Sequence, residues 1–279
     1  MVSAIVLLAA AASAAEPDAP PSGSELRFVR DGTIVRRIDR AGLERSCSVR
    51  TVEIDDPYYG TRKSFRACPL AEVLAIGFGK DAVPRGDDDV FLRARDGYVK
   101  TVPARVLGEA GGYLALADAA YARDGDPGWQ PIDRRQVDPG PYYLVWAKPE
   151  QRDVHGYPWP YQLVVIETSS FARAYPHMLP TTAPAGSPPW AGFAIFRNEC
   201  VSCHAINGEG GKVGPDLNVP QSIVEYRPVE QIKAFVRDPR TFRYTSMPAH
   251  PDLSAADLDG LIAYFDVMKT LKHDPGPTP

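Results

Sequence analysis

The sequence of 279 residues predicts two domains, an α+β or mostly-β domain over residues 25–177 and an all-α domain over residues 190–273. Three observations predict this division. The length suits two domains of ordinary size. Strand-like segments fill the first part, and helical spacing of apolar residues fills the second. Between them, residues 178–189 hold four prolines and no charge, which is typical of a semi-rigid linker.

The composition excludes several classes of protein. Hydrophobic residues make up 44% and charged residues 24%, so the chain has enough apolar surface to form a core. The net charge of -4 leaves no basic surface for nucleic acid, and we expect no nucleic-acid partner. Four cysteines are too few for a scaffold built on disulfides.

The first 15 residues resemble an export signal. An apolar run over residues 2–15 ends in Ala12-Ser13-Ala14, the small-residue pattern of a cleavage site, although no Lys or Arg precedes it. The run is too short to span a bilayer. We therefore expect a signal peptide over residues 1–15 and a soluble protein that is periplasmic or otherwise exported, without stable membrane insertion. The alternative is a disordered N-terminal tail.

Strand signals dominate the first domain in chain order. Branched and aromatic residues predict strands at 26–29, 51–54, 90–94, 98–102, 142–146 and 161–166. A turn signal covers residues 55–60, and residues 70–77 have helical spacing that ends at a glycine. Tyr142, Tyr143 and Trp146 are expected to alternate between core and surface.

The second domain begins and ends with a predicted helix. Residues 190–196 have helical spacing, and Gly192 would let another helix approach closely. A shorter helix is predicted over residues 228–236. Ser254 and Asp257 form a near capping box before the last helix, where Met268 is expected to fill the core.

The most informative residues are Cys200, Cys203 and His204, which form the C-x-x-C-H pattern of c-type haem attachment. Two thiols one helical turn apart can add to the two haem vinyl groups, and the adjoining imidazole then lies under the iron. The alternatives are half of a zinc site or a redox-active cysteine pair. A zinc site needs two further ligands at suitable spacing, and a redox pair gives no reason for the histidine.

Met247 is the predicted second axial ligand, because it lies in an extended Ser-Met-Pro segment far enough from His204 to close the other face of a haem. Its alternative role is to fill a gap in the core. His250 is the rival ligand, or otherwise an exposed loop residue. The carbonyl of Pro215 is expected to orient the His204 ring, although Pro215 would equally serve only to shape its loop.

Residues 190–272 resemble a class I monohaem cytochrome c, with CVSCH, GPDL, SMP and a final helix carrying IAYF in the order of that family. The resemblance implies one covalent haem c, axial ligation by His204 and Met247, and one-electron transfer with redox partner proteins. A six-coordinate iron has no open position for oxygen or peroxide chemistry.

The first domain resembles the sulfite-oxidase-type molybdopterin-binding fold, through the segment Pro69–Leu74 and the Asp96-Gly97-Tyr98 strand start. In that family a cysteine thiolate binds molybdenum, and Cys47 is the candidate by position. The sequence shows no evident cluster of Arg, Lys and His for a pterin phosphate, so we expect no molybdenum cofactor. The alternatives for Cys47 and Cys68 are a disulfide, favoured by export and by a hairpin near residues 58–61, free thiols or another metal.

Three functions remain open from the sequence. The preferred one is an exported electron carrier with no catalytic residue, in which the first domain, free of cofactor, docks a partner. The second is a molybdenum oxidoreductase that passes electrons internally to the haem. The third is a haem-based sensor or assembly factor.

Overall fold

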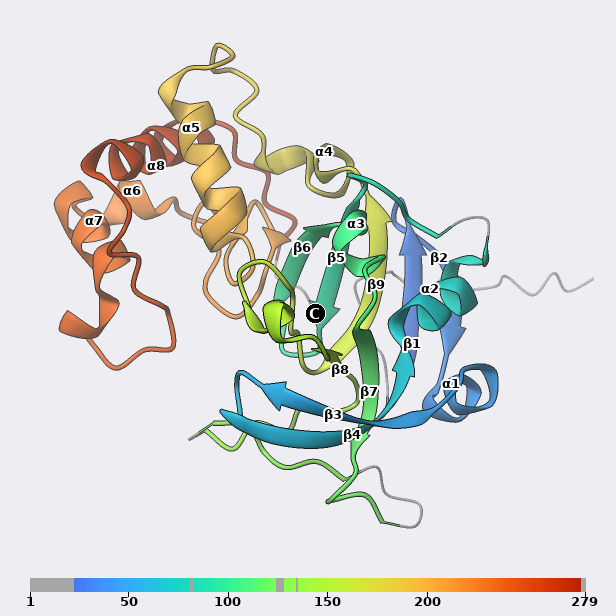
Figure 1. The fold of residues 1–279 in the computed structure, drawn as a ribbon. Helices are drawn as coiled ribbons and strands as arrows, with labels where there is room; N and C mark the ends of the chain where they lie inside the picture. The colour runs from blue at the N-terminus through green and yellow to red at the C-terminus, as the bar shows by residue number, and fades with distance from the viewer. Residues whose placement is uncertain (1–22, 81–82, 124–127, 134, 277–279) are drawn as a thin grey trace, which may run out of the picture.

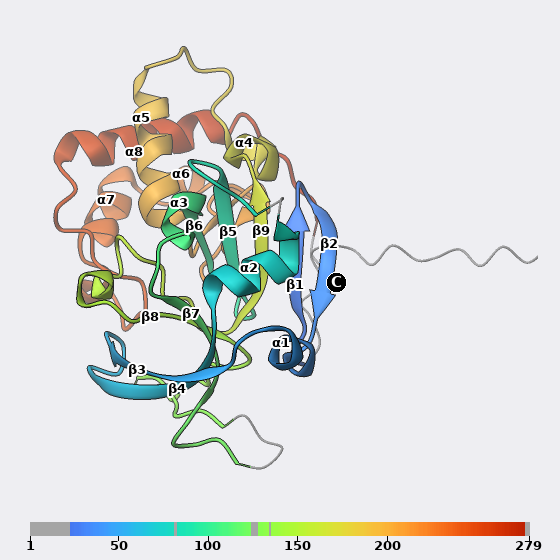
Figure 2. The same cartoon turned by 45° about the vertical axis from the view of Figure 1, so that its right-hand side comes forward.

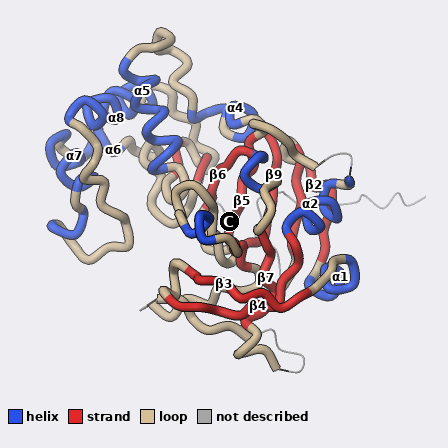
Figure 3. The backbone as a smooth tube through the Cα atoms, viewed as in Figure 1, coloured by secondary structure: helices blue, strands red, loops and turns tan. Residues whose placement is uncertain are grey.

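A computed structural model describes residues 23–80, 83–123, 128–133 and 135–276. The predicted signal peptide therefore lies outside the described residues. The chain forms a mostly-β N-terminal region and a helical C-terminal region, which lie side by side in both views (Figures 1 and 2). Coloured by secondary structure, the two regions separate clearly into strands and helices (Figure 3).

Two sheets build the N-terminal region. The five-stranded sheet has the order β2-β1-β9-β5-β6, with β1 and β9 parallel and the other pairs antiparallel. The four-stranded sheet has the order β3-β4-β7-β8. The strands are β1 (Leu26–Arg30), β2 (Thr33–Ile38), β3 (Arg50–Asp56), β4 (Thr61–Pro69), β5 (Asp89–Ala94), β6 (Val99–Pro103), β7 (Gly112–Asp118), β8 (Tyr143–Trp146) and β9 (Leu163–Ser169).

Short helices connect these strands, and one apolar cluster of both sheets and α2 forms the core. The helices are α1 (Arg40–Ser46), α2 (Leu70–Phe78), α3 (Ala104–Leu107), η2 (Pro149–Arg152), α4 (Phe171–Ala174) and η3 (Pro176–Met178). The predicted strands and the helix near residues 70–77 are present. The expected alternation in β8 is wrong: Tyr142, Tyr143 and Trp146 are all buried, since Tyr142 donates to the carbonyl of Ser24 and Trp146 to that of Pro158.

Helices build the C-terminal region, together with the two-stranded pair of β10 and β11. The elements are α5 (Pro188–Ile195), η4 (Phe196–Cys200), β10 (Ala205–Ile206), β11 (Glu209–Gly210), α6 (Ile223–Tyr226), α7 (Val229–Arg237), η5 (Pro239–Thr241) and α8 (Ala255–Met268). Helix α8 begins at the predicted capping box of Ser254 and Asp257, and Met268 is fully buried. At the crossing of α5 and α8, a side chain on Gly192 would meet the Gly260 carbonyl and come within 2.9 Å of the Leu261 nitrogen.

The stretch expected to be a linker is partly built into the structure. Met178 is fully buried in the C-terminal core, and its carbonyl accepts a hydrogen bond of 2.7 Å from the Tyr264 hydroxyl. At the other end, Pro188 and Pro189 form the first turn of α5, where proline is well tolerated. Only the middle of the stretch serves as a connection. In the described part of the chain, no helix is both long enough and apolar enough to cross a membrane.

Candidate haem site

The C-x-x-C-H segment follows directly from helix α5. The α-helical turns end at Ile195 and widen into a π-helical turn over Phe196–Cys200, closed by the Val201 amide on the Phe196 carbonyl at 2.9 Å. π-Helical turns occur frequently at functional sites. The buried ring of Phe196 anchors this turn in the core. The segment is therefore delivered from a fixed element.

Cys200 and Cys203 lie one turn apart and are both free thiols. The His204 and Cys203 amides both bond to the Cys200 carbonyl, at 2.9 and 3.1 Å, which keeps the segment compact. Burial raises the pKa of Cys200 to about 12 and also raises the pKa of Cys203. A redox-active pair needs a thiol with a lowered pKa, so these environments disfavour that alternative.

The His204 ring has a fixed orientation. Its Nδ1 lies 2.9 Å from the carbonyl oxygen of Pro215, and because a carbonyl only accepts, Nδ1 carries the hydrogen. Burial lowers the pKa of His204, which keeps the ring neutral. The Nε2 lone pair is then free to bind a metal.

The loop that carries Pro215 is held by its own side chains. Asp216 accepts hydrogen bonds from the backbone amides of Gly208, Asn218 and Val219, at 2.7, 2.7 and 2.9 Å. The Asn218 amide donates to the carbonyl of Met268 in α8 at 2.8 Å. Sequence reasoning did not assign roles to Asp216 and Asn218, although the GPDL motif contains the first of them. Together they fix the carbonyl that orients His204.

Met247 differs from the other methionines of the domain. Met178 and Met268 are fully buried, whereas Met247 is half-buried and lies outside the hydrophobic core. Its amide donates to the Thr245 hydroxyl at 3.1 Å, which shapes the extended segment. Among the described residues this leaves the Met247 thioether without a core-filling role.

His250 is not the exposed loop residue that was considered as its alternative role. Its side chain is only 14% exposed, and Nδ1 lies 3.7 Å from a carboxylate oxygen of Glu199. Its amide also donates to the Val236 carbonyl at 3.1 Å. His250 thus has partners that explain its position without a metal.

Apolar side chains gather at the surface of this small domain. Five of the eight large hydrophobic residues exposed in the described structure belong to it, and Tyr244 is fully exposed beside Met247. The five are Val213, Tyr226, Val229, Phe242 and Tyr244. A neutral imidazole, two adjacent thiols, a thioether and exposed apolar side chains together fit a covalently attached haem.

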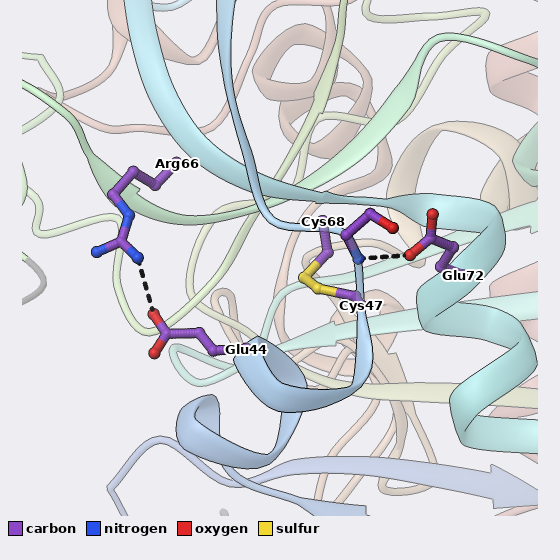
Figure 4. Close-up of a disulfide and its surroundings, with 6 residues drawn as sticks. Glu44, Cys47, Arg66, Cys68 and Glu72 are labelled. Atoms are coloured by element: carbon purple, nitrogen blue, oxygen red, sulfur yellow. Dashed lines mark hydrogen bonds and ion pairs between the residues drawn. A yellow bond between two sulfur atoms is a disulfide. The ribbon is translucent and has the colours of Figure 1, made fainter.

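Cys47 and Cys68 are joined in a disulfide at the far side of the N-terminal region (Figure 4). The β3–β4 hairpin pairs Arg50 with Ala67, and this register brings the two cysteines to a Cα separation of 5.8 Å. Next to the bond, the Ser48 amide donates to Glu72 at 2.6 Å. A sulfur in a disulfide cannot be a thiolate ligand, so Cys47 in this form does not supply one.

A cavity in the N-terminal region contains a group of cationic residues that the sequence did not reveal. It has a volume of about 520 Å³ and is lined by Arg40, Arg95 and Arg123, with Asp138 and the Trp129 ring. The Trp129 indole N–H is buried and has no acceptor among the described residues. No such cluster is evident in the sequence, because the fold gathers arginines that are far apart along the chain.

Comparison with known proteins identifies the helical region. Residues 188–265 match the family model described as cytochrome C oxidase, cbb3-type, subunit III. The chain is 35% identical over 88 residues to cytochrome c oxidase subunit 2 of Alkalihalophilus pseudofirmus, covering 29% of this chain and 26% of that protein. It is 34% identical over 122 residues to lupanine 17-hydroxylase [cytochrome c] of a Pseudomonas species, covering 40% of this chain and 16% of that protein.

The matches thus span about a quarter and about a sixth of these relatives. They characterise a module and not a whole protein. The sequence matches, the helical fold and the C-x-x-C-H segment all indicate the same kind of module. The C-terminal region of this chain is a cytochrome c domain, homologous to haem-binding electron-transfer proteins, and it is fused to a mostly-β N-terminal region.

Proposed function

We propose that this chain is an exported c-type cytochrome that carries single electrons through one covalently bound haem. The observation that carries the proposal is the C-x-x-C-H segment with its oriented histidine, in which the Pro215 carbonyl fixes Nδ1 of His204. When bound, the haem supplies a one-electron iron couple.

Each residue of the site then has a distinct task. The thiols of Cys200 and Cys203 form the thioether bonds that make attachment permanent. His204 binds the iron through Nε2, and burial keeps this nitrogen unprotonated. Met247 would supply a thioether sulfur as the second iron ligand, a ligand type that raises the reduction potential relative to a second histidine. With two protein ligands on the iron, the chain would carry electrons without binding a substrate there.

The N-terminal region of the proposed carrier is a cofactor-free relative of the sulfite-oxidase-type fold that docks or positions a redox partner. The Cys47–Cys68 disulfide supports this reading, since it removes the thiolate that the molybdenum alternative requires. The arginine-lined cavity is the one observation that favours the alternative, because guanidinium groups suit a pterin phosphate. Metal analysis separates the two: the carrier contains iron and no molybdenum, whereas about one molybdenum per haem would establish the oxidoreductase.

A ligand-exchange experiment tests the axial assignment. Replacing Met247→Ala should abolish the sulfur-to-iron charge-transfer band and lower the reduction potential. The matched control is Met268→Leu, a buried methionine whose replacement should leave the band in place. His250→Ala should also leave it in place. A band that persists in Met247→Ala would overturn the assignment. In the sensor alternative a ligand displaces Met247, so a spectrum that carbon monoxide does not change argues against it.

A further inference from the structure

The turn between β5 and β6 makes two backbone hydrogen bonds to the cytochrome domain, one of them to the haem-attachment segment. The Val99 amide donates to the Ser202 carbonyl at 3.0 Å, between the two cysteines of C-x-x-C-H. Two residues before Val99, the Gly97 carbonyl accepts a hydrogen bond from the Lys212 amide at 2.8 Å. The turn of the N-terminal region is therefore hydrogen-bonded to two backbone segments of the cytochrome domain, at Ser202 and at Lys212.

Apolar packing joins the same two regions next to these hydrogen bonds. Phe91 and Val99 of the five-stranded sheet share one hydrophobic core with Phe196 and Val201 of the cytochrome domain. Figures 1 and 2 both show β5 and β6 beside the segment that leads away from α5. A shared core prevents the two regions from moving independently at this point.

A charged contact fixes the same junction at its edge. The guanidinium of Arg197, in the π-helical turn, bonds to Asp89 at 2.9 Å and lies 4.5 Å from the centre of the Phe171 ring. The residue that starts β5 is thereby joined to the turn that carries Cys200.

Polar groups of the N-terminal region also lie beside the haem-attachment segment. The Tyr98 side chain shares a hydrogen bond with Ser202, the residue before Cys203, and Asp96 belongs to the same turn as Tyr98. Asp96 itself is anchored, because its Oδ1 accepts the Tyr98 amide at 3.0 Å. A haem held by Cys200 and Cys203 would therefore have this turn of the N-terminal region next to its attachment segment.

We propose that the β5–β6 turn, Asp96-Gly97-Tyr98, is part of the haem site and sets the reduction potential of the cytochrome domain. The inference rests on the proposed function, since it requires a haem on Cys200 and Cys203. The turn acts in two ways. It covers the Cys203 edge against water, which favours the reduced iron, and it places the Asp96 charge nearby, which favours the oxidised iron. The N-terminal region is thus a tuning element for the haem, beyond any role in docking.

The effect of the Asp96 charge on the reduction potential is tested by Asp96→Asn. This variant keeps the oxygen that accepts the hydrogen bond from the Tyr98 amide and removes only the negative charge. The ratio of reduced to oxidised haem at a fixed ambient potential should rise by at least about threefold, where tenfold corresponds to about 59 mV for one electron. Asp39→Asn is the matched control, because it makes the same charge change at the N-cap of α1, far from the cytochrome domain, and also retains its hydrogen bond to a backbone amide. It should leave the ratio unchanged.

The shielding of the Cys203 edge from water is tested by Gly97→Ala. Gly97 has a φ of +91°, and an added Cβ would lie 2.9 Å from the Lys212 Cβ and 3.3 Å from the Lys212 backbone. The matched control is Gly32→Ala in the β1–β2 turn, with a φ of +76° and nothing within 4 Å. Both variants bear the same backbone strain, but only Gly97→Ala should push the turn away, admit water and lower the reduced-to-oxidised ratio.

The outcomes separate this inference from the proposed function. A wild-type chain that carries no covalent haem overturns both. If the haem is bound and titrates normally, but Asp96→Asn behaves like Asp39→Asn and Gly97→Ala like Gly32→Ala, only the tuning role is overturned. Should Gly97→Ala fail to fold, the Asp96→Asn result alone decides, because that exposed side chain supports no core packing.

Discussion

The glycine before Pro215 contacts the His204 ring, and replacing it with alanine tests how tightly the proximal histidine is held. A Cβ on Gly214 would lie closest to Cε1 of the ring, and 2.7 Å from Nδ1 and 2.9 Å from Nε2. A comfortable contact is about 3.5 Å, so either the ring or the loop must shift by about 1 Å. A shift of the ring lengthens the Nδ1 bond to the Pro215 carbonyl from 2.9 Å to beyond the usual range.

Overpacking of this kind costs about 1–3 kcal/mol, which for a protein of this size lowers the melting temperature by about 2–12 °C. We expect Gly214→Ala to melt lower than wild type when unfolding of the loaded protein is followed through the haem absorbance. Its reduction potential should shift as well, because the ligand is displaced. Gly108→Ala is the control, since its Cβ would have its nearest contact at 3.5 Å. If both variants melt together and keep the wild-type potential, the account of the His204 orientation is refuted.

Three further predictions concern the N-terminal region. Asp118→Asn should lower the free energy of unfolding by about 3–5 kcal/mol, because it leaves the buried Lys63 ammonium without the carboxylate 2.5 Å away; a loss below 1 kcal/mol in denaturant titration would contradict this. Burial raises the pKa of Asp56 in the folded protein above its unfolded value, so the stability of the protein falls as the pH rises through the raised pKa. Asp56→Asn should therefore be more stable than wild type at pH 7 and should lose this advantage below about pH 4. Equal stability of the two proteins at both pH values would argue against this. Replacing Cys47 and Cys68 together by serine should cost about 3 kcal/mol, as expected for a closed loop of this length, and leave the haem spectrum intact; a changed spectrum would show that the disulfide serves the haem site.

Local chemistry made the helices of the cytochrome domain predictable. The C-x-x-C-H segment, the capping box of Ser254 and Asp257 and the small residue at Gly192 each act through neighbours within a few residues or through one helix contact. The sequence therefore predicted the helices of the cytochrome domain and the GPDL loop next to His204. The β3–β4 hairpin was predictable for the same reason, since one turn sets its register.

Long-range pairing was not predictable in this way. The parallel pairing of β1 with β9 joins segments from opposite ends of the N-terminal region, and no local signal encodes it. The arginine-lined cavity likewise gathers residues from distant parts of the chain. Met178 was expected in a linker because prolines follow it, yet it is buried in the cytochrome core. The alternation expected in β8 is wrong because both faces of that strand are covered by chain segments distant in sequence.

The contact between the β5–β6 turn and the cytochrome domain was also not predictable from local sequence. An Asp-Gly pair predicts a hairpin turn but does not say what the turn contacts. The contact arises because Gly97 leaves room for Lys212, and because Val99 presents its amide to Ser202. Tertiary packing decides such contacts, and they connect the two domains at the C-x-x-C-H segment.

The mass of the intact chain under denaturing conditions tests the central claim most directly. The protein should be exported from a host that attaches haem c, then measured beside a variant with Cys200→Ala and Cys203→Ala. Because thioether bonds survive denaturation, the account predicts that the wild-type chain is heavier than its polypeptide by one haem, and that the variant shows the polypeptide mass alone. A wild-type chain at the bare polypeptide mass, or a variant that retains the added mass, would contradict it.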